Sequence, residues 1–464
     1  MKKLIVLAAF AVLALSCAKK DEYGYTIKDN QIVYNTPPRP ADQQSMLGFA
    51  AEPIEHVRIG LVGLGDRGSG AVRRLPFVDD ATIVALCDLY PERVERAQKI
   101  LEGIGAPRAL YEYSGEEGYK ELCERDDIDL VYLAVPWQLH TTIALYAMEH
   151  GKHVAIEVPA ATSIAECWAL VNTSERTRKH CMMLENCCYD FFELTCLNMS
   201  QQGLFGDVVH VEGSYCHNLD PWWDNYQGDW RMTYNKDHHG DVYPTHGIGP
   251  VCQVLGIHRG DRMEELVSMD TGAFAGQAKA DARYGEGAVK YENGDLTSTM
   301  IRTHNGRTIL VEHDVVTPRP YNRMYQIVGT KGYANKYPSP GLALGSDAAE
   351  ILSSDDLDAE KYMSDEKRDS LLAAFKHPIA KEIEELARKV GGHGGMDFIM
   401  DYRLIYCLHN GLPLDEDVYD AAEWNSLVEL TEVSIAHVSM PVVMPDFTRG
   451  EWDRLDGLKF YSYL

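Results

Sequence analysis

The sequence is short of positive charge and of long apolar runs. Its 464 residues carry 44 lysines and arginines against 70 aspartates and glutamates, and the formal net charge of −26 is spread along the chain. This balance argues against nucleic-acid binding and favours solubility, and it says nothing of the fold. After residue 15 no stretch is apolar enough to cross a membrane, and we find no internal repeat or low-complexity segment.

The first 17 residues have the parts of a secretory signal. A Lys2-Lys3 pair precedes an apolar stretch from Leu4 to Leu15, and Ser16-Cys17 follows. A cysteine at the cleavage point resembles a bacterial lipoprotein signal, with Cys17 lipidated after cleavage. A transmembrane anchor is the alternative, but the apolar stretch is too short to span a bilayer. We therefore predict a signal peptide over residues 1–17 and a protein of the bacterial cell envelope. It would touch the membrane only through its lipid anchor, in the periplasm or on the outer-membrane surface.

Cysteine pairs at a zinc-binding spacing are also missing. Eleven cysteines in an exported chain would suggest disulfides, but most lie in apolar or helical patterns, the usual setting of small buried side chains. We expect a buried, unpaired state for Cys87, Cys123, Cys167, Cys187, Cys188, Cys196, Cys252 and Cys407.

Residues 18–55 are polar, contain Pro37-Pro38-Arg39-Pro40 and show no clear period, which predicts a tether and an arm lying across the folded body. From residue 56 to 185, apolar strands alternate with helices. The expected strands are Val57–Val62, Thr82–Cys87, Leu130–Val135 and His153–Glu157, and the expected helices begin at Gly68 and span Pro91–Gly103. This alternation is typical of an α/β fold with a doubly wound parallel sheet.

After about residue 186, longer strands are joined by hydrophilic connections. The expected strands are Val208–Ser214, Leu266–Ala273, Leu296–His304, Thr308–Val315 and Met324–Val328. A polar, aromatic-rich loop is expected from Asp220 to Pro250, and helices at Met396–Leu408 and Val418–Ala436. Residues 186–464 are thus predicted to form a second, α+β domain with a large, mostly antiparallel open sheet, which is a candidate homodimer face.

A glycine turn follows the first strand and opens the first helix, as Gly63-Leu64-Gly65-Asp66-Arg67-Gly68. Gly63 permits the tight turn, Gly65 lets the backbone approach a pyrophosphate, and Gly68 allows close packing of helix on strand. The pyrophosphate would lie on free N–H groups at the positive end of the helix. Asp88, which ends the second strand, would accept hydrogen bonds from the adenosine ribose and repel the phosphate of NADP. The turn therefore predicts NAD.

The loops 136–140 and 157–159 are expected to carry the nicotinamide end, because ligands bind beyond the carboxyl ends of parallel strands. His140 has a competing interpretation as a helix cap or a core histidine. Soluble NAD is a cytoplasmic cofactor, and Lys2-Lys3 is not a twin-arginine pair, so the chain is expected to cross the membrane unfolded and to find NAD outside. An enzyme that reduces and reoxidises one bound NAD in each turnover needs no exchange of spent cofactor, which favours a redox-neutral reaction.

These motifs resemble the glucose–fructose oxidoreductase and inositol dehydrogenase family, which pairs a Rossmann domain with an open-sheet domain. Its dehydrogenases carry Glu-Lys-Pro where this chain has Glu157-Val158-Pro159, and an aspartate four residues before the catalytic histidine, where this chain has Val242 before His246. Both departures match one branch, glycoside hydrolase family 109, whose characterised members resemble NAD-dependent α-N-acetylgalactosaminidases. The similarity runs from about Arg58 to the C-terminus. Its motifs are 137–140 (Trp-Gln-Leu-His), 157–159, 185–189 (Glu-Asn-Cys-Cys-Tyr), 221–223 (Pro-Trp-Trp), 230–231 (Trp-Arg) and 240–247 (Gly-Asp-Val-Tyr-Pro-Thr-His-Gly).

The resemblance implies two sets of contacts and a mechanism. NAD would be bound by Asp66, Arg67, Asp88, Trp137, Gln138, Leu139, His140, Glu157, Val158 and Asn186. The sugar pocket would be lined by Tyr215, Arg231, Tyr243, Pro244, Thr245, His246 and Tyr325. The implied mechanism does not use paired carboxylates. NAD oxidises C3, loss of the C2 proton expels the aglycone, water adds to C1, and C3 is reduced again, with overall retention.

His246 is suited to taking the C3 hydroxyl proton, because imidazole titrates near neutral pH. Tyr243 or Tyr189 is a candidate for the C2 proton if a nearby cation lowers its pKa, and Arg231 could be that cation or hold the acetamido group. The predicted activity is hydrolysis of terminal α-linked N-acetylgalactosamine from a glycan. The alternatives are a sugar or cyclitol oxidoreductase, which would accumulate NADH, and an inactive sugar-binding lipoprotein. A metal site at residues 237–241 is an alternative use of their histidines and carboxylates, but the resembled family needs no metal and none is predicted.

Overall fold

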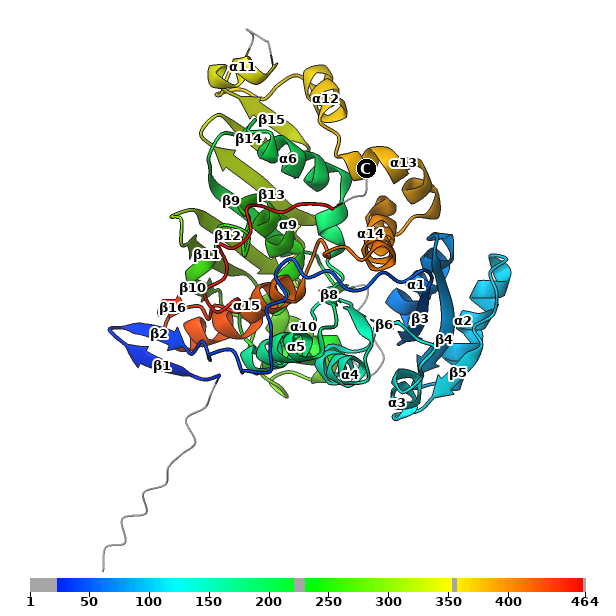
Figure 1. Ribbon diagram of the computed structural model, residues 1–464. Coiled ribbons are helices and arrows are strands. Elements are labelled where there is room, and N and C mark those ends of the chain that lie inside the picture. The colour runs from blue at the N-terminus through cyan, green and yellow to red at the C-terminus, as the bar shows by residue number, and fades with distance from the viewer. Residues whose placement is uncertain (1–22, 221–229, 353–356, 462–464) are drawn as a thin grey trace, which may run out of the picture.

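The computed structural model describes residues 23–220, 230–352 and 357–461, which build two sheets with helices around and between them (Figure 1). The first sheet is parallel and has the order β5-β4-β3-β6-β7-β8. Its strands are β3 (Val57–Val62), β4 (Ala81–Asp88), β5 (Tyr111–Ser114), β6 (Leu130–Leu133), β7 (His153–Ile156) and β8 (Cys181–Met183). Counted from β3, this order is 3-2-1-4-5-6, which is that of a Rossmann fold. The predicted parallel sheet is confirmed.

Helices follow most of these strands. They are α1 (Asp66–Arg74), α2 (Pro91–Gly103), α3 (Gly118–Cys123), α4 (Trp137–Glu149) and α5 (Ile164–Thr177), with a short 3-10 turn η1 (Leu75–Phe77). The residues of β6, β7 and β8 are all buried. Continuous burial is what strands covered on both faces require, and it explains their unbroken apolar sequences.

The second sheet has ten strands in the order β1-β2-β16-β10-β11-β12-β9-β13-β14-β15. Within it only the pairs β9·β12 and β2·β16 run parallel among the described strands, so the sheet is mostly antiparallel, as predicted. Its strands are β1 (Tyr25–Lys28), β2 (Gln31–Tyr34), β9 (Val208–Cys216), β10 (Met263–Asp270), β11 (Thr297–Thr303), β12 (Thr308–Asp314), β13 (Asn322–Gly329), β14 (Gly332–Asn335), β15 (Gly341–Leu344) and β16 (Val442–Val443).

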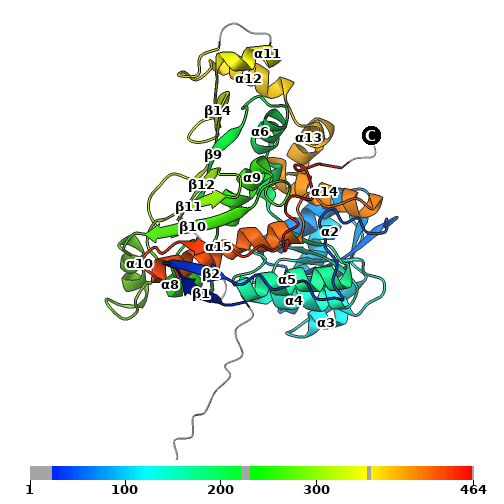
Figure 2. The ribbon, with the colours of Figure 1, turned by 60° about the vertical axis from the view of Figure 1, so that its left-hand side comes forward.

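Many helices follow β8. They are η2 (Asn186–Tyr189), α6 (Phe191–Gln201), α8 (Trp230–Asp237), α9 (Thr245–Leu255), α10 (Ala275–Tyr284), η4 (Ser346–Ala348), α11 (Ala349–Leu352), α12 (Asp365–Ala374), α13 (Pro378–Val390), η5 (His393–Gly395), α14 (Met396–Asn410) and α15 (Val418–Ala436). Two of them, α9 and α15, pack directly on strands of this sheet. Helix α15 packs on α5 and β8 on one side and on β10 on the other, and so lies between the two sheets (Figure 2).

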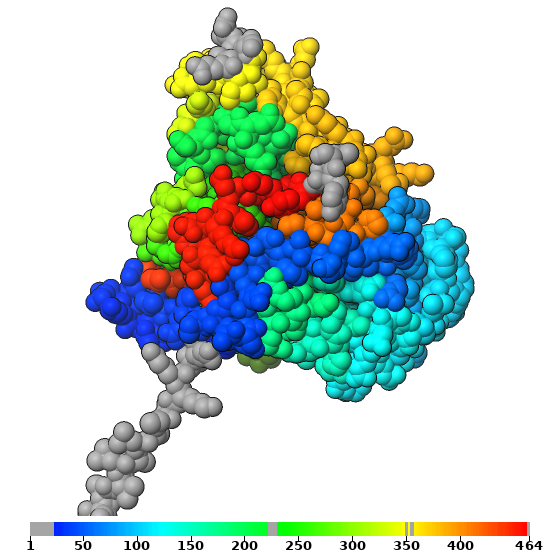
Figure 3. Space-filling model, in the orientation of Figure 1, coloured from blue at the N-terminus to red at the C-terminus, as the bar shows by residue number. Residues whose placement is uncertain are grey.

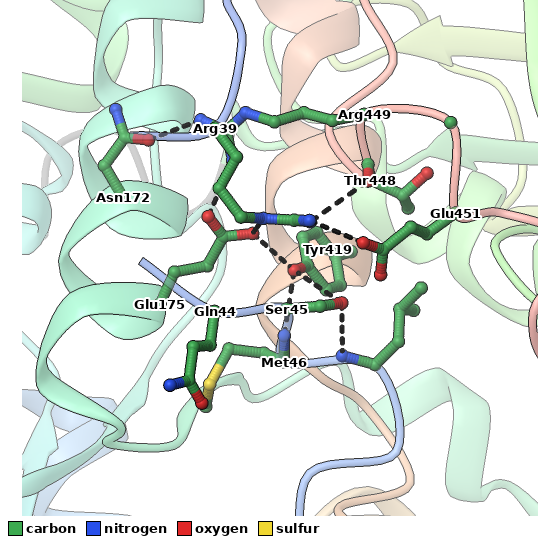
Figure 4. A network of polar contacts seen from close by, with 12 residues as sticks. Arg39, Gln44, Ser45, Met46, Asn172, Glu175, Tyr419, Thr448, Arg449 and Glu451 are labelled. Atoms are coloured by element: carbon green, nitrogen blue, oxygen red, sulfur yellow. Dashed lines mark hydrogen bonds and ion pairs between the residues drawn. The ribbon is translucent and has the colours of Figure 1, made fainter. Parts of the chain in front are cut away.

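The segment from residue 23 to 55 crosses the molecule beside the C-terminal segment (Figure 3). It begins with the β1–β2 hairpin, which adds to the second sheet through β16. Further along, Arg39 reaches the buried carboxylate of Glu175 on α5 at 3.2 Å, and Arg449 from the C-terminal segment reaches the same carboxylate at 2.7 Å (Figure 4). The Tyr419 hydroxyl donates to it as well, at 2.6 Å. The N-terminal arm and the C-terminal segment are thereby both bound to one buried acid.

The predicted loop from Asp220 to Pro250 is wrong, because α8 and the first half of α9 lie within it. The sequence of α9 contains Gly247, Gly249 and Pro250, which are poor helix formers. Packing overrides that propensity, since a Cβ at Gly247 would lie 2.6 Å from the backbone nitrogen of Ser214 on β9. Glycine is therefore what allows α9 to approach the sheet so closely. The motif residues 221–223 lie outside the described residues.

The predicted state of the cysteines is confirmed. All ten cysteines of the described residues are buried and free, including the eight named above. Cys17 lies outside the described residues. Within the described ranges, no helix combines the length and the apolarity that crossing a bilayer needs.

Candidate active site

The glycine turn has the three properties expected of a dinucleotide site. Gly63 has φ +91°, and a Cβ there would lie 2.4 Å from the carbonyl oxygen of Ala134. A Cβ at Gly68 would lie 1.8 Å from the carbonyl oxygen of Gly63, so α1 contacts the turn directly. Around a Cβ at Gly65, by contrast, no described atom lies within 4 Å. Gly65 caps α1 without a side chain, so the first N–H groups of the helix face open space that fits a phosphate.

Asp88 lies beside this turn at the carboxyl end of β4. Its Oδ2 accepts a hydrogen bond from the Leu64 N–H at 2.7 Å, and its Oδ1 accepts one from the Tyr90 N–H at 3.0 Å. The carboxylate is thus fixed against the glycine turn, and each oxygen keeps a further lone pair for a ribose hydroxyl. The residues of this region fit NAD.

Two glycine substitutions should separate cofactor binding from folding. In Gly65→Ala the new methyl group meets no described atom, so we expect the free energy of unfolding of the apoprotein to change by less than about 0.5 kcal/mol. The methyl group nevertheless fills the space in front of α1, and NAD affinity should fall by about tenfold or more. In Gly68→Ala the turn itself must shift, so stability and NAD binding should fall together. Chemical denaturation and the NAD content of the purified protein measure both effects, and undiminished NAD binding by Gly65→Ala would contradict the assignment.

The loops after β6 and β7 bury three of the predicted residues and leave two exposed. Trp137 begins α4 and is buried, and Glu157 follows β7 and binds Arg67 at 2.7 Å. Val158 is buried beside Glu157. Gln138 and Leu139 lie on the exposed side of the first turn of α4.

His140 proves to be a core histidine. It is 1 % exposed, and its Nδ1 lies 2.7 Å from the carbonyl oxygen of Pro159. Burial lowers the pKa of the imidazole, so Nδ1 carries the proton and donates it to that carbonyl. His140 therefore supports the loop that carries Glu157.

A carboxylate–imidazole pair lies in the second domain. His246 stands in the first turn of α9, and its Nδ1 lies 2.7 Å from Oε1 of Glu185, just after β8. Glu185 is fully buried. Burial raises the pKa of its carboxyl, but the His246 ring, together with the side chains of Cys187 and Thr245, outweighs burial and lowers that pKa to about 2. Burial lowers the pKa of His246 below its usual 6.5. The result is an anionic carboxylate holding a neutral imidazole whose Nε2 is available as a base.

Aromatic rings and one guanidinium surround Nε2 of His246. The Tyr243 hydroxyl lies 3.5 Å from it, and the Tyr243 ring stacks on Trp137 with the centroids 5.4 Å apart. The Tyr215 ring lies 5.4 Å from the imidazole. Arg231 donates to the Tyr215 hydroxyl at 3.3 Å and lies 4.7 Å from the centre of the Tyr243 ring. Trp137 from the Rossmann domain thus meets the predicted sugar-binding residues of the second domain.

Arg231 is present as the cation predicted beside Tyr243, but it does not make that tyrosine a base. Burial raises the pKa of Tyr243 well above its usual range, and the opposite effect of Arg231 is smaller. Tyr243 is therefore a neutral phenol at neutral pH and suited to donating a proton. Of its neighbours in the motif, Pro244 caps α9 and Thr245 is fully buried.

Two predicted site residues lie elsewhere. Tyr189, a candidate for the C2 proton, is wholly buried and packs edge-on against Phe460. Burial and the acids Glu416 and Asp415 raise the pKa of its hydroxyl well above the usual range, so the structure contradicts a role as base. Tyr325 is 3 % exposed and donates its hydroxyl to the carbonyl oxygen of Glu193 on α6, which fixes it on the helix side of β13.

The sequence prediction missed Glu185 and Arg323 as site residues. Arg323 lies on β13 and its Nη1 contacts Sγ of Cys187. Ligand-type atoms of Glu185, Cys187 and His246 lie within 4.8 Å of one another, a spacing that a metal could use. The guanidinium against the thiol opposes a second cation there, so we assign the group to proton transfer. The position of Glu185 at the carboxyl end of a Rossmann strand was the signal that could have identified it.

The histidines of the alternative metal site face different partners. His238 lies 3.2 Å from Glu432, and His239 lies 3.1 Å from Asp270. Asp241 is buried away from them and accepts a hydrogen bond from the Tyr243 N–H at 3.0 Å. Asp241 therefore shapes the turn that leads into α9.

Comparison with known proteins divides the chain at the same point as the fold. Residues 57–185 match the model of the oxidoreductase family with an NAD-binding Rossmann fold. Residues 189–454 match the glycosyl hydrolase 109 C-terminal domain. NAD is the cofactor of the first of these families, and several similar solved structures contain it.

Solved structures share the fold at low sequence identity. The levoglucosan dehydrogenase complex with NADH superposes with a TM-score of 0.61 at 18% identity, over 84% of this chain and all of that one. An inositol dehydrogenase homologue from Azotobacter vinelandii, complexed with NAD+, gives 0.60 at 17% identity, over 85% of this chain and 99% of that one.

Curated relatives match over nearly the whole length. Glycosyl hydrolase family 109 protein 1 of Bacteroides thetaiotaomicron is 54% identical over 99% of both chains. The protein of the same name from Phocaeicola vulgatus is 56% identical over 91% of this chain and 90% of its own. A family 109 protein of Porphyromonas gingivalis is 53% identical over 92% of both. With both domain models matched and full-length relatives above half identity, the chain belongs to glycosyl hydrolase family 109.

Proposed function

We propose that this enzyme hydrolyses terminal α-linked N-acetylgalactosamine from glycans, with retention, and reuses one bound NAD. The observation that carries the proposal is the neutral His246 held by Glu185, with the Tyr243 phenol 3.5 Å from its Nε2. When bound, NAD supplies a hydride acceptor and donor. A base and an acid side by side are what the remaining proton transfers require.

The roles of the side chains follow from their protonation. His246 takes the C3 hydroxyl proton through Nε2, while Glu185 fixes the tautomer and stabilises the imidazolium that forms. Tyr243, a phenol in this environment, donates its proton to the departing aglycone oxygen and takes the C2 proton in exchange, so that it is a phenol again when the elimination is complete. Arg231 lies over the Tyr243 ring and anchors the sugar, with the acetamido carbonyl as its acceptor.

Two departures from the dehydrogenases support hydrolysis over net oxidation. Val158, buried next to Glu157, has no amine to offer a substrate hydroxyl, and Val242 offers no carboxylate before His246. The alternative, a sugar or cyclitol oxidoreductase, shares the Rossmann fold and the cofactor.

The test uses the purified protein without residues 1–17 and without added cofactor. An aryl α-N-acetylgalactosaminide is offered, and phenol release and NADH absorbance are followed together. We expect many phenols per enzyme and no net NADH. Steady NADH formation on adding free NAD and sugar, without phenol, would establish the oxidoreductase instead. Glycan binding with neither signal would indicate an inactive binding protein.

Export and anchoring are part of the proposal. Support comes from the sequence Lys2-Lys3, Leu4–Leu15 and Ser16-Cys17. The full chain should partition into detergent after metabolic labelling with palmitate, and Cys17→Ala should abolish the label. An unlabelled wild-type chain would refute the anchor.

The pH profile should show a base that works below the usual range of histidine. Because burial lowers the pKa of His246 from 6.5, the imidazole stays unprotonated further into acid, and the acid limb of kcat/KM should lie below pH 6.5. Glu185→Gln removes the anion that opposes this shift, so its acid limb should move lower still. Initial rates from about pH 4 to 8 measure both. An acid limb above pH 6.5 would contradict a neutral His246 in the free enzyme.

A further inference from the structure

An unusual loop joins α13 to α14. All five of its residues, Gly391-Gly392-His393-Gly394-Gly395, have positive φ, from +47° at His393 to +117° at Gly395. Positive φ is easy for glycine and uncommon for histidine. The glycines therefore let the backbone fold tightly around a single side chain. That side chain is about half exposed, and its Nδ1 lies 2.9 Å from Oδ2 of Asp397.

Asp397, in the first turn of α14, is the centre of a buried network. It is 1 % exposed, accepts hydrogen bonds from Arg67 at 3.1 Å, Asn186 at 2.5 Å and His393 at 2.9 Å, and forms an ion pair with Arg74 at 3.4 Å. Burial alone would raise its pKa, but the neighbouring arginines and His393 hold the pKa of Asp397 well below its usual range. It is an anion at any working pH.

The loop, residues 391–395, packs tightly against this network. A Cβ at Gly392 would lie 2.7 Å from Cβ of Asp397 and 2.8 Å from Cδ of Arg74. Arg74 belongs to α1, the helix that opens at the glycine turn, and α14 lies beside β3 (Figure 1). The loop of the second domain is thus packed directly on the cofactor-binding helix.

Two of these four partners of Asp397 belong to the NAD side of the site. Arg67 is part of the glycine turn, contacts Glu157 through a second pair of atoms, and lies with Nη1 3.3 Å from Nδ1 of His393. Asn186 follows the last strand of the Rossmann sheet and is 2 % exposed. Asp397 therefore fixes, from across the domain boundary, two side chains that are predicted to contact NAD.

We propose that residues 391–397 form a clasp that retains NAD. Asp397 positions Arg67 and Asn186, and His393 holds the clasp closed from the solvent side. For NAD to leave past residues 391–397, the ion pair between Arg67 and Asp397 must separate. Separation deprives the buried Asp397 carboxylate of one of its charged partners. The clasp slows dissociation of NAD, as an enzyme away from the cytoplasmic NAD pool needs. The inference rests on the NAD site and is independent of the sugar hydrolysed.

The test measures NAD retention. Full-length mature protein is saturated with NAD, freed of excess by gel filtration, and sampled during dialysis; NAD released by acid is counted per chain. Asp397→Asn should lose NAD about tenfold faster than the wild type or more, because a hydrogen bond to a charged group is lost. His393→Ala should lose it severalfold faster with an unchanged melting temperature of the apoprotein. The matched control is His304→Ala, whose histidine is similarly exposed, pairs with Glu264 and follows β11 in the second sheet.

The outcomes are decisive in both directions. A folded Asp397→Asn or a His393→Ala variant that retains NAD like the wild type overturns the clasp. If Asp397→Asn does not fold, the exposed His393→Ala decides alone, because a merely structural role for that side chain predicts an unchanged dissociation rate. Since NAD is counted without any glycoside, failure of the clasp and failure of the proposed hydrolysis are seen separately.

Discussion

Replacing Glu185 by glutamine is expected to lower kcat for aryl glycoside hydrolysis by about 10²- to 10⁴-fold. The carboxylate is buried and its Oε1 lies 2.7 Å from Nδ1 of His246. Glutamine keeps the size of the side chain but removes the negative charge that stabilises an imidazolium. It also offers an amide N–H that can reverse the tautomer of His246 and remove the lone pair from Nε2.

The measurement separates this role from cofactor binding and from folding. NAD content per chain should match the wild type, because Glu185 contacts His246 and the Cys187 N–H rather than the glycine turn. Glu429→Gln is the matched control: this glutamate, also on a packed face, accepts from Tyr34 and from the Ile164 N–H rather than from His246. The control should lose stability and keep kcat. A Glu185→Gln enzyme with wild-type kcat would show that the pair has no part in proton transfer.

The Rossmann half of the fold could be predicted closely from the sequence, because its signals are local. Strand β3 and helix α2 begin and end at the predicted residues, and the turn at Gly63 behaves as its spacing indicates. Buried parallel strands are continuous apolar runs, and such runs are visible without any partner. The short edge strand β5 was missed because its residues alternate between half-buried and exposed and include no apolar run.

The N-terminal arm, residues 23–55, contains strands that a local sequence pattern does not reveal. Strand β1 is exposed along its length, so no apolar periodicity marks it, and β2 finds its partner β16 some four hundred residues away. A signal was nevertheless present: Asp29 and Asn30, both at positive φ, form the two-residue turn of a hairpin. Pairing between segments far apart in the chain leaves no pattern in either segment alone, so the sequence of the arm does not predict it.

In the site, residue types were easier to predict than their surroundings. Histidine and tyrosine at positions 246 and 243 were identified, and the structure brings them together. The protonation of Tyr243 could not be foreseen, because it depends on burial against Trp137, which comes from the other domain. Tyr189 was misplaced for a related reason: its place in the motif 185–189 says nothing about the direction of the ring, which the turn η2 points towards Phe460.

A single methyl group on β9 should disrupt catalysis from a distance. In Gly213→Ala the new Cβ would lie 2.0 Å from the carbonyl oxygen of Gly247 in α9, and both atoms belong to packed backbone. Relief requires α9 to move away from the sheet. We expect the free energy of unfolding to fall by roughly 2–4 kcal/mol, the range of severe overpacking.

The same movement should cost activity, because His246 is in the first turn of α9 and cannot stay 2.7 Å from Glu185 when the helix shifts. A displacement of about 1 Å at a catalytic group lowers the rate by about 10²-fold. Gly103→Ala is the control, since a Cβ at this end of α2 meets no described atom within 4 Å and should leave stability and kcat unchanged. Urea denaturation and kcat, measured on both variants, test the argument. A Gly213→Ala enzyme as stable and active as the wild type would mean that the approach of α9 to β9 does not set the position of His246.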